Sequence, residues 1–90
     1  QMNELEEQIK EYLTNKSAEL LSIEPNAVEW ESDIDEYGFE SMKINKLCVD
    51  INNTFGIEVR PAVLLEYTSL AEFSDYLKKE HYAKMEEVLM

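Results

Sequence analysis

The stretch Tyr37-Gly38-Phe39-Glu40-Ser41-Met42-Lys43-Ile44 marks the point where an acidic segment ends and the most clearly patterned apolar segment begins. After Ser41, apolar residues recur at intervals of about three and four, which is the period of one helix face and not of a strand. These apolar residues are Met42, Ile44, Leu47, Cys48, Ile51 and Phe55. The pattern predicts a helix from Ser41 to about Thr54, ended by Gly56, because glycine readily adopts the left-handed conformation that follows helices.

Ser41 has two interpretations at the start of this helix. Its hydroxyl could accept a hydrogen bond from an unpaired N–H group of the first turn, which would make it a capping residue. Alternatively, it could be the attachment point of a phosphate-bearing group, since the helix dipole places partial positive charge there. Capping is the commoner role for a lone serine before an apolar run, so the position alone leaves both interpretations open.

The composition favours one small helical domain. The chain has 90 residues, 44% of them hydrophobic, and contains only two glycines and two prolines. Few residues are therefore committed to turns, and the apolar content is sufficient for a compact core. We expect a single domain over residues 1–90 with a folded core at about 3–80. Residues 81–90 are expected to extend the last helix or to form a linker.

The charge and the cysteine content restrict the partners and the compartment. A net charge of −12 repels nucleic-acid phosphates and anionic membranes, whereas it suits partners with basic patches. One cysteine, Cys48, excludes an internal disulfide, fits a reducing compartment, and falls on the apolar stripe as a small buried residue. No apolar run approaches the roughly 20 residues of a membrane span. We therefore expect a cytoplasmic protein, monomeric as an isolated domain, that binds neither nucleic acid nor membranes.

Three further helices are predicted around a long first loop. Helical spacing covers Met2 to Leu21, and Pro25 ends that helix. Residues 22–40 then form a connection that is long for a compact domain, but apolar side chains can hold it to the bundle. Those anchors are Val28, Trp30, Ile34, Tyr37 and Phe39.

The second half of the chain predicts a short helix followed by a longer one. Pro61 to Tyr67 reads as a short third helix with proline at its first position. A capping box from Ser69 to Glu72 begins the last helix, which ends near Glu80. The expected fold is therefore all-α, a four-helix bundle with a long first loop and a short third helix.

Catalytic and metal-site interpretations lack the necessary residues. Nucleophilic catalysis by Ser41 would need a histidine base, and the only histidine, His81, lies near the C-terminus and is expected to be exposed. Zinc would need more ligands than one cysteine and one histidine. The segment Asp33-x-Asp35-x-Tyr37-Gly38 is similar to half of a calcium-binding loop, but its fifth position is a tyrosine and its twelfth, Ile44, is not a carboxylate. We expect neither catalysis nor a bound metal.

The motif at residues 38–42 resembles the Gly-hydrophobe-Asp-Ser-hydrophobe signature of acyl carrier proteins. The segment 36–41 is especially similar to the carrier domains of modular polyketide synthases, and the resemblance extends from about Ile9 to Leu77. In that family the serine carries a covalent 4′-phosphopantetheine, whose thiol holds an acyl chain as a thioester. The resemblance implies that Ser41 is the attachment residue, with Gly38, Phe39, Glu40 and Met42 as its flanking motif. Glu40 departs from the usual aspartate by one methylene group.

The resemblance also implies partners. They are a phosphopantetheinyl transferase and the ketosynthase, acyltransferase and other domains of a synthase. Met42 is expected both to pack in the helix and to contact the transferase. Lys43 and Lys46, on the outer face of the same helix, are either partner contacts or solvated side chains. Leu65-Glu66-Tyr67-Thr68 is most similar to systems whose acyltransferase acts in trans.

Two alternatives remain open. The first is a peptidyl or stand-alone fatty-acid carrier, which uses the same chemistry for different clients. The second is an unmodified acidic helical module that only binds proteins. Intact mass after treatment with a broad-specificity transferase would separate the second from both carriers.

Overall fold

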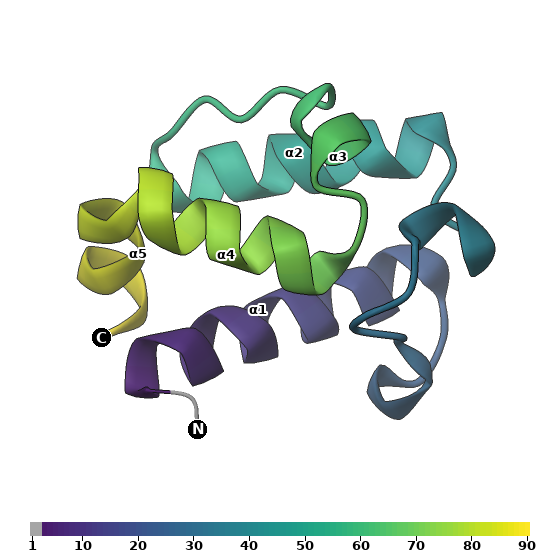
Figure 1. The fold of residues 1–90 in the computed structure, drawn as a ribbon, viewed down its shortest axis with the longest axis horizontal. Helices are drawn as coiled ribbons and strands as arrows, with labels where there is room; N and C mark the ends of the chain where they lie inside the picture. The colour runs from purple at the N-terminus through teal and green to yellow at the C-terminus, as the bar shows by residue number, and fades with distance from the viewer. Residues whose placement is uncertain (1–2) are drawn as a thin grey trace.

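The computed structural model describes residues 3–90, and every regular element in this range is helical (Figure 1). The helices are α1 (Glu4–Leu21), α2 (Ser41–Phe55), α3 (Val63–Glu66), α4 (Leu70–Glu80) and α5 (Tyr82–Leu89), with 3₁₀ turns at Pro25–Ala27 and Ile34–Glu36. The predicted all-helical bundle, with its long first loop and short third helix, is confirmed, and one further helix is present. Met2, where the sequence pattern of the first helix begins, lies outside the described residues.

The core lies between α1, α2 and α4. Figure 1 shows these three helices packed together, with α5 at one end of the bundle and the long first loop at the other. On α2, the apolar stripe is buried at Leu47, Cys48, Ile51 and Phe55. The Phe55 ring meets Tyr12 of α1 edge-on, with centroids 5.1 Å apart. The stripe thus fixes which face of α2 is turned inward.

Met42 does not belong to that stripe, although the sequence pattern included it. Its side chain is 78% exposed. Each helical residue advances by about 100°, so Met42 lies roughly 140° around the axis from Leu47, which is buried. The expected packing role of Met42 within the helix is therefore wrong, and its side chain is presented to solvent beside Ser41.

The long first loop is held to the bundle, as predicted. Ile34 and Phe39 are buried, and Trp30 is half-buried with Lys10 Nζ 5.3 Å from its ring centroid. Two backbone hydrogen bonds tie the loop to the start of α4. Ile34 N donates to Thr68 O and Ala71 N donates to Trp30 O, both at 2.9 Å. These bonds and the buried side chains give the loop a defined path without making it a helix.

The third helix begins later than predicted, and the cap of the fourth differs from the prediction in one hydrogen bond. α3 starts at Val63, because Pro61 and Ala62 form a turn before it and only one helical turn follows. Ser69 caps α4 by accepting a hydrogen bond from Glu72 N at 3.1 Å, as predicted. The reciprocal bond of the capping box is different, since Glu72 Oε1 accepts from Thr68 N at 3.0 Å. The carboxylate therefore caps one residue earlier than a standard box.

Residues 82–89 form the additional helix α5, where we expected a continuation of the last helix or a linker. The chain bends at His81, and α5 turns back so that Met85 is fully buried against the bundle. Its neighbours are α1, α2 and α4. None of the helices within residues 3–90 is both long enough and apolar enough to cross a bilayer.

Candidate functional site

Ser41 is the first residue of α2 and is exposed to solvent. The N-cap position belongs to Glu40, whose carbonyl oxygen accepts from Lys43 N and Ile44 N, both at 2.9 Å. The Glu40 side chain makes no capping hydrogen bond. The capping interpretation of Ser41 is therefore wrong, because its hydroxyl stands one position too late in the chain to take that role.

Gly38 allows the chain to turn toward this helix. Its φ of +112° lies in the region that side chains of L-residues rarely adopt. A Cβ atom at Gly38 would meet Leu21 Cδ2 at 3.6 Å, an ordinary contact, so the backbone conformation and not space requires glycine. On either side, Tyr37 is half-buried and Phe39 is 3% exposed. The buried Phe39 fixes the loop, and the two residues after it emerge at the surface.

Two hollows lie between α2 and α3 beside Ser41. The first, here called the Ser41 hollow, has a volume of about 220 Å³ and is lined by Ser41, Ile44, Asn45, Pro61, Ala62 and Leu65. The second, here called the α3 pocket, has a volume of about 140 Å³ and is lined by Asp33, Ile34, Asp35, Ile44, Leu64, Leu65 and Thr68. Ile44 and Leu65 line both, so Leu65 stands at the boundary between them. Ser41 lines only the first hollow, and the second adjoins it at these two shared apolar residues.

Exposed apolar side chains flank Ser41 from two helices. Leu65 of α3 is 80% exposed, and Met42 of α2 is 78% exposed. Large apolar side chains exposed together beside a hollow are typical of a surface that another molecule covers. Sequence analysis named Leu65 only as part of the segment 65–68 and not as a residue of the site. Its only local signal is the Leu64-Leu65 pair, because two neighbouring residues on a one-turn helix cannot both face the core.

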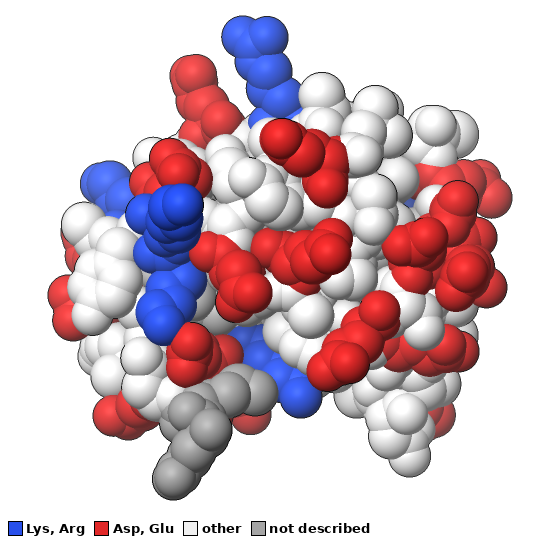
Figure 2. Space-filling view, viewed as in Figure 1, with Lys and Arg blue, Asp and Glu red and all other residues white. Residues whose placement is uncertain are grey.

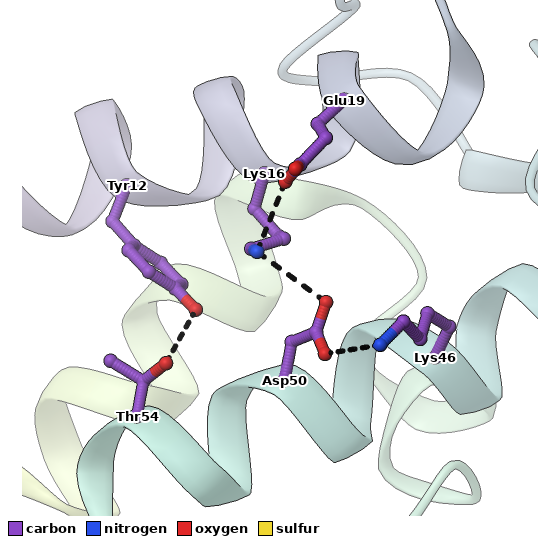
Figure 3. Close-up of polar contacts among 6 residues, drawn as sticks. All are labelled: Tyr12, Lys16, Glu19, Lys46, Asp50 and Thr54. Carbon is purple, nitrogen blue, oxygen red and sulfur yellow. Dashed lines mark hydrogen bonds and ion pairs between the residues drawn. The ribbon is translucent and has the colours of Figure 1, made fainter.

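Lys43 and Lys46 lie on the same helix with different surroundings. Lys43 is half-buried, and Lys46 donates to Asp50 Oδ1 at 2.8 Å one turn along α2. Figure 3 shows that the other oxygen of Asp50 faces Lys16 of α1, 3.4 Å away, and that Lys16 also pairs with Glu19 at 3.0 Å. This cluster, here called the α1–α2 ion cluster, joins the two helices and partly neutralises Lys46.

The ionisation of the α1–α2 ion cluster reflects these contacts. The hydrogen bond from Lys46, reinforced by Lys16, holds the pKa of Asp50 below its usual 3.8. The hydrogen bond to Glu19, together with Asp50, raises the pKa of Lys16 above 10.5. A wider hollow of about 400 Å³ runs along α1 near Leu89, and Ser41 does not line it.

The remaining candidate residues are separate from Ser41. Cys48 is 2% exposed, as predicted, and burial raises the pKa of its thiol to about 11. His81 is half-buried at the bend between α4 and α5, with its ring 5.8 Å from that of Tyr76, and is not exposed as expected. Asp33 accepts a hydrogen bond from Thr68. Within residues 3–90, no group of three or more side chains has an arrangement that could hold a metal ion.

Comparison with known proteins places this site in a family. The sequence signature described as "Phosphopantetheine attachment site" matches residues 11–77, a range that contains Ser41 and all of α2. The chain belongs to this family. Its domains carry a covalently attached 4′-phosphopantetheine and are themselves non-catalytic. The resemblance stated from the sequence is thereby confirmed.

A polyketide synthase is among the relatives. The chain is 26% identical over 73 residues to polyketide synthase PksN of Bacillus subtilis (strain 168), a match that covers 81% of the chain. The chain spans about 1% of the length of that relative. The similarity therefore concerns one small part of a very large protein.

Two solved structures share the fold. One is a free-standing peptidyl carrier protein from Acinetobacter baumannii, with a TM-score of 0.76, 20% identity, and coverage of 79% of this chain and 89% of the other. The second is the HMG-ACPI domain from the CurA module of Lyngbya majuscula, with a TM-score of 0.80, 24% identity, and coverage of 93% and 86%. At these identities the likeness establishes the fold, which acyl and peptidyl carriers have in common.

Proposed function

We propose that the chain is an acyl carrier domain of a modular polyketide synthase, of the type served by a trans-acting acyltransferase, and that Ser41 carries the 4′-phosphopantetheine. One observation carries the proposal. The family match includes a serine that stands exposed at the first position of a long helix, directly after a glycine turn and a buried phenylalanine. The polyketide synthase among the relatives supports a polyketide synthase as the system to which this domain belongs.

The site fits the prosthetic group. Because the Glu40 side chain makes no capping bond, the first-turn N–H groups of α2 have no side-chain acceptor at the N-cap position. They point toward the end of the helix at which Ser41 lies, where an attached phosphate would interact favourably with the helix dipole. When bound, the group supplies a flexible thiol that holds the acyl chain as a thioester.

Attachment requires a transferase to activate Ser41. The Oγ atom attacks the phosphorus that bears the pantetheine arm of coenzyme A, a new O–P bond forms, and the adenosine 3′,5′-bisphosphate leaves. The hydroxyl proton passes to a base of the transferase, because the only histidine of the chain, His81, is at the bend between α4 and α5. The chain contributes placement of the serine and no catalytic group.

The surface around Ser41 is proposed as the docking surface for the transferase and for the ketosynthase, acyltransferase and other synthase domains. Met42 and Leu65 offer exposed apolar contacts. Lys43 and Lys46 offer positive charge in a chain of net charge −12. Figure 2 shows acidic side chains spread across the face on which α1 and α4 lie, with a smaller number of basic side chains among them. We propose cytoplasmic action as a single monomeric domain.

A peptidyl carrier is the second candidate, and the likeness to a free-standing peptidyl carrier protein favours it. The attachment chemistry would be identical, and only the cargo would differ. Holo protein offered malonyl groups by a discrete acyltransferase, or an amino acid by an adenylation domain, separates the two. The acyl carrier proposal expects malonyl loading alone.

Intact-protein mass spectrometry tests the attachment. Incubated with coenzyme A and a broad-specificity transferase, the wild-type chain is expected to gain one phosphopantetheine, and the Ser41→Ala variant none. Ser32→Ala, a matched change in the first loop, is expected to be modified as the wild type is. If the wild-type chain stays unmodified under conditions that load a known carrier domain, both carrier functions are excluded. The remaining alternative is then an unmodified helical module that only binds proteins.

A further inference from the structure

The helix that carries Leu65 cannot hold its position by itself. α3 is a single turn of four residues, Val63–Glu66, and Leu64 is its only buried side chain. Short isolated helices are unstable in water, and one buried leucine leaves the orientation of such a turn weakly determined. The placement of Leu65 beside Ser41 therefore depends on how the chain is fastened before and after α3.

The fastening before α3 comes from α2 itself. The Asn52 side chain accepts a hydrogen bond from Val59 N at 2.8 Å and donates one to Val59 O at 3.0 Å. Both bonds are partly buried, and the backbone of Val59 is satisfied on both sides. Val59 is 2% exposed. This fastening, here called the Asn52 anchor, is continuous with the helix that begins at Ser41.

The fastening after α3 comes from the long first loop and is centred on Thr68. Its carbonyl oxygen accepts from Ile34 N and its hydroxyl donates to Asp33 Oδ1, both at 2.9 Å. Its N–H group donates to Glu72 at 3.0 Å. The bond between Thr68 and Asp33 is exposed, so water competes for both partners. This fastening is here called the Thr68 anchor, and its hydroxyl bond is more exposed than the two bonds of the Asn52 anchor.

The Thr68 anchor also forms part of the site. Asp33 and Thr68 both line the α3 pocket, and Ile44 and Leu65 line it with them. If the hydroxyl bond between Thr68 and Asp33 breaks, the end of α3 nearest Leu65 is held only through the backbone bonds of Thr68, while the Asn52 anchor still holds its beginning. The two anchors differ in burial, so α3 should swing about its first residues.

We propose that Thr68 and Asp33 are positioning residues for the loading reaction, which hold α3 so that Leu65 stands beside Ser41 when the transferase binds. The proposal rests on the attachment of phosphopantetheine to Ser41. Neither residue touches the reacting atoms. Their effect is on binding of the carrier domain to the enzyme, because Leu65 is a contact and not a chemical group.

Steady-state transfer from coenzyme A tests this role. Thr68→Val keeps the shape of the side chain and removes the donor, and it is expected to raise the KM for the carrier domain about fivefold with kcat nearly unchanged, the effect of one lost hydrogen bond. Thr68→Ser should keep the wild-type KM, and Asp33→Ala, which removes the acceptor, should raise it. Thr14→Val, the same change on α1, is the matched control. An unchanged KM in Thr68→Val, or an equal rise in Thr14→Val, would overturn the proposal.

Amide hydrogen exchange tests the anchor without any modification of Ser41. The Ile34 amide donates to Thr68 and the Val59 amide donates to Asn52, so each reports one anchor. In Thr68→Val, exchange at Ile34 should accelerate about fivefold while exchange at Val59 stays as in the wild type. Equal acceleration at both amides would indicate general loosening and contradict a local anchor. A wild-type chain that is never loaded contradicts the proposed function, and this exchange result still decides the anchor.

Discussion

Glu40 occupies the N-cap of α2 without using its side chain. Its extended backbone, with φ −97° and ψ 174°, is the conformation from which a shorter carboxylate reaches the first-turn N–H groups. Glutamate, one methylene longer, is not among the preferred N-cap residues, and its side chain makes no such bond here. One methylene group thus separates a helix that is capped by its own side chain from a helix whose end is left to other acceptors.

Replacing Glu40 by Asp is expected to stabilise the chain by about 0.5–1 kcal/mol, because the shorter side chain can complete the cap. Urea denaturation at neutral pH measures this difference. Glu58→Asp, the same change in the exposed connector before α3, should leave the midpoint unchanged. Equal stabilisation by both variants would show that capping is not the cause. Loading of Ser41 should persist in Glu40→Asp, since the change restores the usual motif.

The features of the site that depend on neighbouring residues could be predicted from the sequence. The features that depend on long-range contacts could not. Gly38 and Ser41 could be identified because a positive φ and a helix start are properties of neighbouring residues. The outward direction of Met42 also followed from helix geometry, although the apolar pattern concealed it. The bond from Thr68 to Asp33 joins residues 35 positions apart, and no local pattern contains it.

The contact between α1 and α2 combines packing with charge. Tyr12 packs against Phe55 and its hydroxyl donates to Thr54 Oγ1 at 3.4 Å (Figure 3). Beside this contact, the Asp50 carboxylate forms ion pairs with Lys16 of α1 and Lys46 of α2. Because the lowered pKa of Asp50 means that the folded chain favours its ionised form, the ion cluster makes this contact sensitive to pH.

Asp50→Asn is expected to lower stability at neutral pH by about 0.5–1 kcal/mol, the value of a partly exposed ion pair. A depressed pKa contributes stability that is present above the usual value of 3.8 and is lost as the pH falls through the folded value. The difference between variant and wild type should therefore vanish in strong acid and shrink in high salt. Urea denaturation at several pH values checks this, with Asp75→Asn on α4 as the control. A difference that persists in acid would contradict the ionic origin.

The elements differed in how well the sequence predicted them. α2 has an apolar stripe of four buried residues, and its period left one choice of face. α3 was expected to begin at Pro61, but proline at a first helical position and proline in a preceding turn have the same local signature. α5 could not be separated from α4, because the bend at His81 has neither glycine nor proline and is fixed by packing.

The whole bundle is closed at one end by α5. Met85 is fully buried there, among α1, α2 and α4. A fully buried methionine leaves a cavity when it is truncated, and the surrounding helices relax only in part. α5 therefore contributes Met85 to the core.

Met85→Ala is expected to destabilise the chain by about 2–5 kcal/mol. Met90→Ala, the same change at a side chain that is 56% exposed, should stay within about 0.5 kcal/mol. Chemical denaturation of both variants measures the contrast. Equal, small effects would mean that α5 is only loosely docked on the bundle.

The burial of Cys48 has a bearing on the use of a thiol arm. Acyl groups and disulfides pass between sulfur atoms through the thiolate, and a thiol that is 2% exposed with a pKa of about 11 offers almost none at neutral pH. If Ser41 bears the arm as proposed, the chain presents a single reactive sulfur, and a thioester formed on it has no second accessible thiol in the same chain to which it can migrate. A colorimetric thiol reagent applied to the native protein would then count empty arms directly, with little contribution from Cys48.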